Sequence, residues 1–302
     1  MPPPEISVVI ASYNARETIG GALAALAASK TDVPFEVVVV DSSSDRTADL
    51  IGAEFPAVTL VRSERRLFPG DARNLGVRRA TGRILAFTDA DCVVARDWIE
   101  ELARAHRRGI AAVGGGIVNA NPETAVSWAN YFCEFVAWLP GGASRPLPDA
   151  PTACLSVTRE TFERFGPFLE GTLCSDSAFC WRLGRAGLPP QFVSAVRVGH
   201  VNVTEVRPYL RRKWRHGRAF ARVRFSEGEM GRVFCLARVM GVPAVPFVLF
   251  ARTVAATWRA RSFRRELVRA APLVLFGQTA WALGEASSYM QCLRSRRPIQ
   301  PW

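Results

Sequence analysis

Short apolar runs alternate with amphipathic stretches through the first two thirds of the chain. Four runs have the length of buried strands, at residues 6–10, 35–40, 58–61 and 84–87. The stretches between them place apolar residues at helical spacing, at residues 17–28, 48–55 and 71–81. Strands that are apolar along their whole length are typical of parallel sheets covered on both faces. The pattern therefore predicts an α/β fold, with a mostly parallel, Rossmann-like central sheet and helices on both of its faces.

The alternation continues less regularly to about residue 200. A fifth strand is expected at residues 110–113, and the three glycines at positions 114–116 are expected to end it. An irregular stretch rich in proline and glycine follows at residues 140–151. After it we expect an apolar segment at 154–157 and a helix at 176–187.

The last third of the chain is basic and apolar. Residues 1–204 carry a net charge of −2, residues 205–269 carry +12, and the tail carries +2. We therefore predict two domains, a catalytic domain at residues 1–204 and a basic, membrane-associating helical region at residues 205–302. Charge concentrated in this way suits an anionic partner, either a membrane surface or a nucleic acid.

Two apolar segments in this region are interrupted by proline. Residues 239–251 contain Pro243 and Pro246, and residues 270–284 contain Pro272. Each uninterrupted run is shorter than the roughly 20 residues of a membrane-spanning helix. Arginines flank both segments on both sides, the last of them at positions 294–297, which favours the cytoplasmic face of the plasma membrane. We expect peripheral or monotopic helices on an anionic leaflet, with a short two-helix hairpin or a soluble helical lid or dimer interface as alternatives.

The cysteines and the first residues indicate the compartment. The seven cysteines are scattered, odd in number and include no C-x-x-C pair, which argues against a disulfide framework or a structural zinc site. The opening MPPPEIS lacks the charged and apolar regions of a signal peptide. Both observations favour a reducing, cytoplasmic setting.

Carboxylates follow two of the predicted strands. Asp89 and Asp91 come directly after the run at 84–87, and ligands of open α/β sheets bind at the carboxyl ends of strands. Two aspartates there suit a hard divalent cation with the phosphates of a substrate, or alternatively form a solvated turn. Asp41 ends the second strand and is placed to accept from a base or a ribose hydroxyl. The neighbouring Ser44 or Asp45 would cap the following helix.

Six segments in this order resemble the family 2 glycosyltransferases with the GT-A fold, over about residues 5–200. They are ISVVIASYN, VVVVDSSSDRT, GDARNLG, ILAFTDADC, CLSVTRETFERFGPF and CSDSAFCWRLGRAG. The resemblance implies transfer of a sugar, with inversion, from a nucleoside diphosphate donor such as a UDP-linked sugar. Two departures stand out. Serines at positions 42–44 occupy a place where many members have a second acid, and Ser175 stands where many have glutamate.

The resemblance also implies roles for individual residues. Those of the base and ribose pocket are Ala11, Tyr13, Asn14, Asp41 and Asp89. Arg73 would support this pocket, by contacting the nucleotide or by pairing with Asp41, unless it is an ordinary surface arginine. Asp91 and His200 would bind Mn²⁺ or Mg²⁺, although a single histidine is often structural.

The same resemblance assigns the chemical step and the acceptor. An inverting displacement needs a base for the acceptor's proton, and Asp176 is the candidate, with a helix N-cap as its alternative. Trp181, Arg182, Lys213 and Trp214 are candidates for contacts with the acceptor or the diphosphate. Trp181 either stacks on the acceptor or only packs. Leu210 stands where processive synthases have Gln or Arg, which argues against processivity.

The predicted function is that of a metal-dependent, inverting hexosyltransferase in cell-envelope or polysaccharide synthesis, acting on a glycan or lipid-linked acceptor. Two alternatives use the same features. A nucleotidyltransferase on a similar sheet would show a glycine-rich basic loop after the first strand, where this chain has ASYNARE. A nucleic-acid-binding protein would use the arginine-rich residues 209–224, but no recognised binding module accompanies them, so we expect no nucleic-acid partner.

Overall fold

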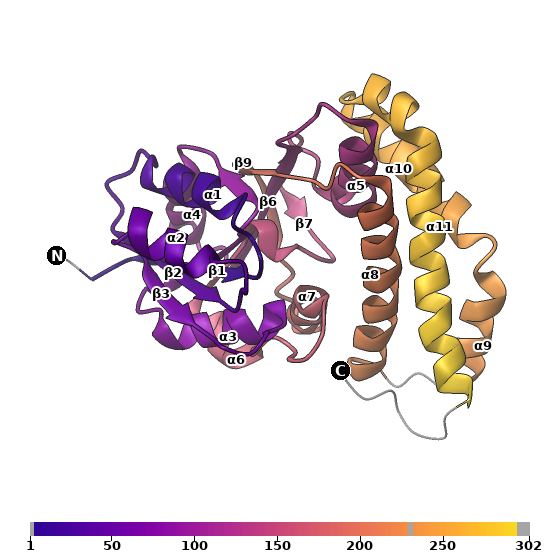
Figure 1. The fold of residues 1–302 in the computed structure, drawn as a ribbon, viewed down its shortest axis with the longest axis horizontal. Helices are drawn as coiled ribbons and strands as arrows, with labels where there is room; N and C mark the ends of the chain where they lie inside the picture. Colours follow the sequence, from indigo (N-terminus) through magenta and orange to yellow (C-terminus); the bar gives the residue numbers. More distant parts are fainter. Residues whose placement is uncertain (1–2, 229–231, 295–302) are drawn as a thin grey trace. The chain divides into compact units, whose positions relative to one another are not determined.

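The computed structural model describes residues 3–228 and 232–294, which form two compact units (Figure 1). The α/β unit contains the described residues up to Ala120, together with Pro140–Gly171 and Ser175–Val201. The helical unit contains Asn121–Leu139, Thr172–Cys174 and the described residues from Asn202 onward. The change of unit after Val201 lies three residues before the predicted division at 204, but the helical unit also includes two earlier segments. Arg296 and Arg297, part of the expected basic flank, lie outside the described residues.

Four parallel strands make up the first half of the sheet, as the apolar runs predict. They are β1 (Ile6–Ser12), β2 (Phe35–Asp41), β3 (Thr59–Arg62) and β4 (Ile84–Asp89), in the spatial order β3-β2-β1-β4. The interior of β1 and β4 and the Val38–Val40 part of β2 are fully buried, which explains why these sequences are apolar without alternation. Each of these four predicted strands is confirmed to within two residues at either end.

The second half of the sheet is mixed. β8 (Leu155–Thr158) is antiparallel to both β4 and β6 (Ala112–Asn119), whereas β9 (Gln191–His200) runs parallel to β6. The short strands β5 (Cys92–Val94) and β7 (Arg145–Pro146) are antiparallel to β9. The expectation that glycines end the strand at residue 113 is wrong. β6 runs through these glycines. They allow close packing, since a Cβ on Gly115 would lie 2.3 Å from the sulfur of Cys154.

Helices cover both faces of this sheet (Figure 1). α1 (Ile19–Ala27), α2 (Thr47–Glu54) and α4 (Trp98–Arg107) lie on one face, and α3 (Pro69–Arg79) and α6 (Arg159–Phe165) lie on the other. α7 (Ser175–Arg185) is held by an aromatic cluster in which Phe87 of β4 and Phe179 of α7 both lie 5.1 Å from the ring of Phe168. This cluster fixes the helix that carries Asp176. Two short 3-10 turns, Val136–Trp138 and Thr152–Cys154, complete the described helical segments.

The helical unit is built around two long helices, α8 (Val206–Ser226) and α11 (Arg264–Arg294). They approach closely because glycines face the partner backbone: a Cβ on Gly217 would lie 2.0 Å from the carbonyl oxygen of Trp281, and one on Gly284 would lie 2.1 Å from that of Trp214. α5 (Ala125–Phe135), α9 (Arg232–Gly241) and α10 (Val245–Ala260) pack around them. Buried Glu285 of α11 is paired with Arg224 and Arg238.

The length expected for the second apolar segment is wrong. α11 continues through Pro272, and its Arg264–Gln291 portion is long and apolar enough to cross a membrane. α9 and α10 reach that length only together, and they are bent by 71° at the break between them. The break between α9 and α10 falls at residues 242–244. It includes Pro243, one of the two prolines that interrupt this apolar segment in the sequence.

Candidate active site

The carboxyl ends of the parallel strands bring three of the predicted donor residues to one edge of the sheet. In the strand register, Asp41 of β2 lies opposite Ser12 of β1, and Asp89 of β4 lies opposite Ala11. Ala11, Asp41 and Asp89 therefore share this edge, as expected for a ligand site at the ends of neighbouring parallel strands.

Asp41 is held by the serines that follow it. Its side chain is almost buried, at 2% exposure, and accepts from the Ser43 hydroxyl at 2.6 Å. The same hydroxyl oxygen accepts from the backbone N–H of Asn14 at 2.7 Å, and the Asn14 side-chain oxygen accepts from the N–H of Ser44 at 3.0 Å. The serines that replace the second acid thus lock the loops after β1 and β2 together. Asp45 accepts from the N–H of Thr47, the first residue of α2, at 3.1 Å, but the residue at the N-cap is Arg46, so neither Ser44 nor Asp45 takes the expected cap position.

Arg73 pairs with Asp89 and not with Asp41. Its Nη2 atom lies 2.6 Å from Oδ1 of Asp89, and the arginine is 5% exposed. The predicted pairing with Asp41 and the alternative of an ordinary surface arginine are both wrong. The guanidinium compensates the charge at the end of β4, while the Asp41 carboxylate accepts from Ser43.

Tyr13 presents its ring at this edge. The residue is 42% exposed, and the Cζ atom of Arg66 lies 4.4 Å from the ring centroid. Arg66 belongs to the loop after β3, which is tied to β2 because the N–H of Ser63 donates to the Asp41 carbonyl at 2.8 Å. Sequence reasoning missed Arg66, since nothing distinguishes it from the adjacent Arg65. A cation over an exposed ring forms a flat surface of the kind on which a base stacks.

Asp91 and His200 are brought together by strand pairing. Cys92 of β5 lies opposite His200 of β9, and the N–H of Val201 donates to the Asp91 carbonyl at 2.8 Å. Oδ1 of Asp91 lies 3.5 Å from Nε2 of His200, and the sulfur of Cys92 completes a cluster within 4.8 Å. Two ligands at about 2.1–2.2 Å from one ion lie about 3.0–3.5 Å apart at angles of about 90–110°. The carboxylate and imidazole therefore fit a shared divalent cation.

Cys92 is less suited to that role. Burial, together with the charges of Asp91 and Asp89, raises the pKa of its thiol well above the ordinary value. The residue is fully buried, so a thiol proton has no easy route to water. The pair of Asp91 and His200 therefore forms the better donor set, with the carboxylate partly exposed and the imidazole 1% exposed.

Asp176 lies in the first turn of α7 and is half-buried. Its Oδ2 atom accepts from the N–H of Thr152 at 3.2 Å and from the hydroxyl of that residue at 3.4 Å. Its Oδ1 atom accepts from the N–H of Ser177 at 3.0 Å. The carboxylate is therefore fixed by two segments of the chain, and Asp176 lies inside the first turn of α7.

Asp149 is a second carboxylate beside Asp176 that sequence reasoning missed. Its Oδ2 atom accepts from the Ser177 hydroxyl at 2.6 Å. Burial, and then the negative charge of Asp176, raises the pKa of Asp149 to about 7. Asp149 is the one acid in the irregular stretch at 140–151, and that was the available signal. Its distance of 27 positions from Asp176 along the chain hides the pairing.

The four candidates for acceptor or diphosphate contacts differ in their location and burial. Trp181 and Arg182 are half-buried on α7, where Nη2 of Arg182 donates to the Pro167 carbonyl at 2.7 Å. In the helical unit, Lys213 is 1% exposed and forms an ion pair with Glu134. Trp214 is exposed on the same helix. The ligand roles of these four residues stay predictions, and the ammonium of Lys213 has a partner inside its own unit.

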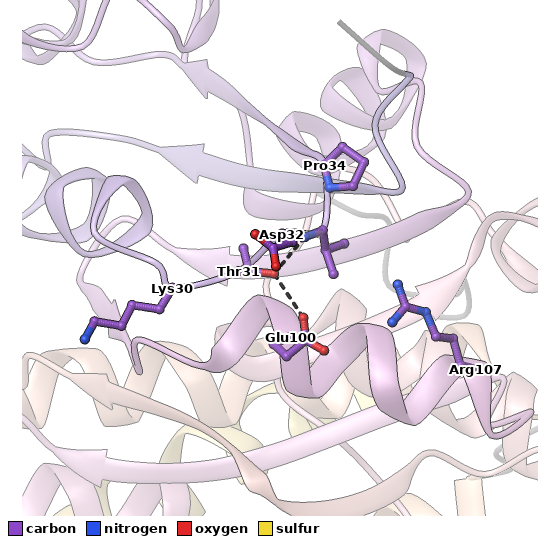
Figure 2. Close-up of a pocket in the computed structure, with 7 residues that line it drawn as sticks. Lys30, Thr31, Asp32, Pro34, Glu100 and Arg107 are labelled. Carbon is purple, nitrogen blue, oxygen red and sulfur yellow. Dashed lines mark hydrogen bonds between the residues drawn. The ribbon is translucent and has the colours of Figure 1, made fainter.

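A separate pocket lies at the other end of β2 (Figure 2). It is lined by the segment that leads into the strand and by α4, through Lys30, Thr31, Asp32, Val33, Pro34, Glu100 and Arg107. The Thr31 hydroxyl donates to Glu100 across it at 3.1 Å. Because ligands of α/β sheets bind at the carboxyl ends of strands, this pocket is not the candidate donor site.

Known proteins resemble both the sequence and the fold. Residues 7–158, half of the chain, match the model of glycosyl transferase family 2. The succinoglycan biosynthesis protein ExoO of Rhizobium meliloti (strain 1021) is 39% identical over 101 residues, which cover 33% of this chain and 29% of that protein. Glycosyltransferase AglE of Haloferax volcanii is 28% identical over 171 residues, or 55% of this chain and 56% of that one. The chain thus spans less than two thirds of the length of either relative.

Two solved structures resemble the whole chain. The mannosyltransferase PcManGT from Pyrobaculum calidifontis, in complex with GDP-Man and Mn²⁺, has a TM-score of 0.61 at 23% identity, covering 95% of this chain and 87% of that one. TarS residues 1–349 of S. aureus, in complex with UDP-GlcNAc, has a TM-score of 0.54 at 16% identity, covering 95% and 92%. These likenesses show the GT-A fold. With a family model that matches half of the chain, over the strands that carry Asp41 and Asp89, this protein belongs to glycosyl transferase family 2.

Proposed function

We propose that this chain is a metal-dependent, inverting glycosyltransferase that uses a nucleoside diphosphate sugar. The observation that carries the proposal is the alignment of Asp41 and the Arg73–Asp89 ion pair along the carboxyl edge of the sheet. The neighbours in complex with GDP-Man and UDP-GlcNAc support this class of donor. A UDP-linked sugar is the first candidate and a GDP-linked sugar the second.

The nucleoside is proposed to bind between the loops after β1 and β2. Tyr13 and Asn14 come from the first loop, and the backbone of Ala11 lies at the strand end. The Asp41 carboxylate retains lone pairs beyond those that Ser43 occupies, so it can accept from a base N–H or a ribose hydroxyl. Asp89 is partly exposed beside Arg73, which suits a contact with the ribose.

Asp91 and His200 would hold a divalent cation, Mn²⁺ or Mg²⁺. Such an ion, when bound, stabilises the negative charge that develops on a leaving diphosphate. An imidazole ligand favours Mn²⁺ over Mg²⁺, because imidazole suits a softer metal than carboxylate oxygen does. The Mn²⁺ in the PcManGT complex supports a divalent ion in this class.

Asp176 is proposed to act as the base. The acceptor hydroxyl gives its proton to the Asp176 carboxylate, and its oxygen forms a bond to the anomeric carbon of the donor. The bond from that carbon to the diphosphate oxygen breaks, and its electron pair leaves with the diphosphate. Attack opposite the leaving group inverts the anomeric carbon. The hydrogen bonds from Thr152 and Ser177 would hold the carboxylate in place for this transfer.

The helical unit is proposed to attach the protein to a membrane surface, because α10 has its polar side inward. Buried Thr253 accepts from the side chain of buried Gln278 at 3.1 Å. Large apolar side chains on α10 are instead exposed, with Phe247 at 65%. The adjoining helices add exposed Val233, Leu236, Met240, Val268, Phe276 and Leu283. A soluble helix buries its apolar side, so this arrangement suits contact with lipid.

Attachment to the surface fits better than a crossing of the bilayer. α11 packs along α8, which carries seven arginines and one lysine, and charged side chains are costly inside the hydrocarbon region. Exposed Arg252 and Arg259 interrupt the apolar side of α10. Arginines at such positions extend to lipid headgroups while the apolar side chains insert. A peripheral or monotopic protein on the anionic cytoplasmic leaflet, acting on a glycan or lipid-linked acceptor in cell-envelope or polysaccharide synthesis, follows as the proposal.

A binding screen tests the donor. The full chain is titrated calorimetrically with UDP, GDP and dTDP sugars, with and without Mn²⁺. We expect one nucleotide class to bind in a Mn²⁺-dependent manner and Asp41→Asn to weaken that binding. Asp45→Asn, which alters the adjacent contact with Thr47, serves as the control. If none of these nucleotides binds, the proposed donor class is wrong.

A further inference from the structure

The carboxyl groups of Asp149 and Asp176 form a pair assembled from two separate segments of the chain. Asp149 precedes the 3-10 turn Thr152–Cys154, and Asp176 lies in α7. Two contacts bridge the segments: the Ser177 hydroxyl donates to Asp149 at 2.6 Å, and the N–H of Thr152 donates to Asp176 at 3.2 Å. Each segment thus supplies one carboxylate and a donor to the other carboxylate, which holds the pair as a unit.

We propose that Asp149 is a positioning residue for the reaction and holds the single proton of this carboxyl pair, so that Asp176 stays ionised to receive the proton of the acceptor. This inference rests on the proposed role of Asp176 as base. Many family members have a glutamate directly before the base, but this chain has Ser175 there. The inference makes Asp149 the acidic partner of Asp176 instead.

Ser175, the residue before Asp176, is packed against the start of α3. It is buried, and its hydroxyl oxygen lies 2.9 Å from the position that a Cβ on Gly70 would take. A glutamate there would have to displace the start of α3. The carboxylate therefore comes from another segment.

The proton is expected on Asp149 for two physical reasons. Its Oδ1 atom is inaccessible to solvent, although the residue as a whole is half-buried, and burial disfavours the charged form. Two carboxylates in one site repel, so one of them keeps a proton into the neutral range. The rise in the pKa of Asp149 to about 7 has these same two causes, burial first and the charge of Asp176 second.

A further titratable group beside Asp149 is the Cys180 thiol of α7. Burial, followed by the charge of Asp149, raises the pKa of that thiol well above its ordinary value, so Cys180 stays neutral through the neutral range. The hydrogen bond from Ser177 acts in the opposite sense, since it favours the ionised form of Asp149. A titration near pH 7 therefore belongs to the carboxyl pair and not to the Cys180 thiol.

This titration has a consequence for rate. Below pH 7, Asp149 is neutral. Above it, the second negative charge beside Asp176 favours transfer of the acceptor's proton to that residue. We expect kcat to rise as the pH increases through about 7, the range in which Asp149 loses its proton.

Carbon-13 NMR of protein labelled at the aspartate carboxyl groups tests the pair without any substrate. One carboxyl signal should titrate near pH 7, vanish in Asp149→Asn and move to lower pH in Asp176→Asn. Ser177→Ala should move it to higher pH, because the lost hydrogen bond favoured the charged form. The isosteric Asn variants keep the shape of the site. If no carboxyl signal titrates above about pH 5.5, or if it survives in Asp149→Asn, the proposal is overturned.

The pH–rate profile tests the link to catalysis, with nucleotide release from the UDP, GDP and dTDP sugars as the readout. Asp149→Asn should lose the rise near pH 7, keep a measurable kcat and leave KM for the donor unchanged. Asp176→Asn should turn over about 10²–10⁴-fold more slowly at every pH. A persistent rise in Asp149→Asn with a slowed Asp176→Asn would refute this inference alone. An Asp176→Asn variant as active as wild type would refute the proposed base itself.

Discussion

The guanidinium of Arg73 lies 2.6 Å from the carboxylate of Asp89 and joins α3 to the end of β4. The arginine is almost buried, whereas the aspartate opens partly to solvent. The pair therefore holds a carboxylate at the strand edge and compensates part of its charge. The pair also ties α3 to β4, the strand that precedes Asp91 of the candidate metal site.

Removal of this guanidinium should destabilise the α/β unit. Arg73→Met leaves Asp89 without its cation, and we expect a loss of about 2–4 kcal/mol in the free energy of unfolding, near the range for a broken buried pair. Urea denaturation measures it. Arg62→Met is the matched control, since Arg62 pairs with Asp49 at 3.3 Å with both side chains more than half exposed, and it should cost less than about 1 kcal/mol. Equal losses would contradict the structural role of Arg73.

The metal prediction has a readout apart from turnover. Mn²⁺ should raise the thermal midpoint of the wild type in the presence of nucleotide, and Asp91→Asn or His200→Gln should abolish that rise. Asp97→Asn, at an exposed pair 4.0 Å from Arg197, should behave as wild type. Chelator should silence turnover, and Mn²⁺ should serve at least as well as Mg²⁺. Full activity in excess chelator would show that no divalent ion is needed.

The raised pKa of Asp149 predicts how stability changes with pH. In the unfolded chain an aspartate has a pKa of about 3.9, and in the folded chain that of Asp149 is about 7. Between these values the folded state holds more protons, so stability falls as pH rises through this window. The Asp149→Asn variant has no carboxyl group at this position, so its stability does not fall for this reason. Relative to wild type, it should gain stability between pH 5 and pH 8 in urea denaturation, and a constant difference would contradict the raised pKa.

Membrane attachment should combine apolar burial with electrostatic attraction. Binding to vesicles should rise with anionic lipid content and fall only partly in high salt, because salt screens the charges and leaves the apolar contact. Phe247→Ser should weaken binding at all salt concentrations, whereas Phe55→Ser, in the α/β unit, should not. Failure to bind vesicles of any composition would leave a soluble helical unit.

Protease accessibility of the connection between α10 and α11 in sealed vesicles separates the two membrane arrangements. A surface-attached unit exposes residues 261–263 on the side to which protein was added. Cleavage only from the opposite side would show a spanning hairpin. That outcome would refute the surface arrangement and keep the membrane partner.

The first four strands of the α/β unit were predictable because each contains a continuous apolar run, which in β1, β2 and β4 reflects burial on both faces. The carboxyl-edge positions of Asp41 and Asp89 follow directly from those strands. Gly114 to Gly116 misled the strand prediction, since glycines in β6 serve close approach by Cys154 and not a turn. The partner of Arg73 was also hidden in the sequence: both Asp41 and Asp89 end strands that pair with β1, and the guanidinium pairs with Asp89.

The helical unit was harder to predict. Pro272 was read as an interruption, but α11 continues through it because packing against α8 and α5 outweighs the lost hydrogen bond. Asp149 could not be paired with Asp176 from sequence, because an irregular stretch has no periodicity from which its place can be inferred. Long-range contacts of loops are the part of a site that local patterns do not encode.

The most direct test of the central claim is nucleotide release by the wild type and by Asp176→Asn, each supplied with the donor that binds and a membrane extract as acceptor source. We predict that the wild type releases the nucleoside diphosphate and labels the extract with sugar. The variant should bind the donor with nearly unchanged affinity and turn over about 10²–10⁴-fold more slowly, as loss of a base requires. Loss of donor affinity in the variant would move Asp176 to the donor site, and release without any sugar transfer by the wild type would contradict the proposed glycosyltransferase.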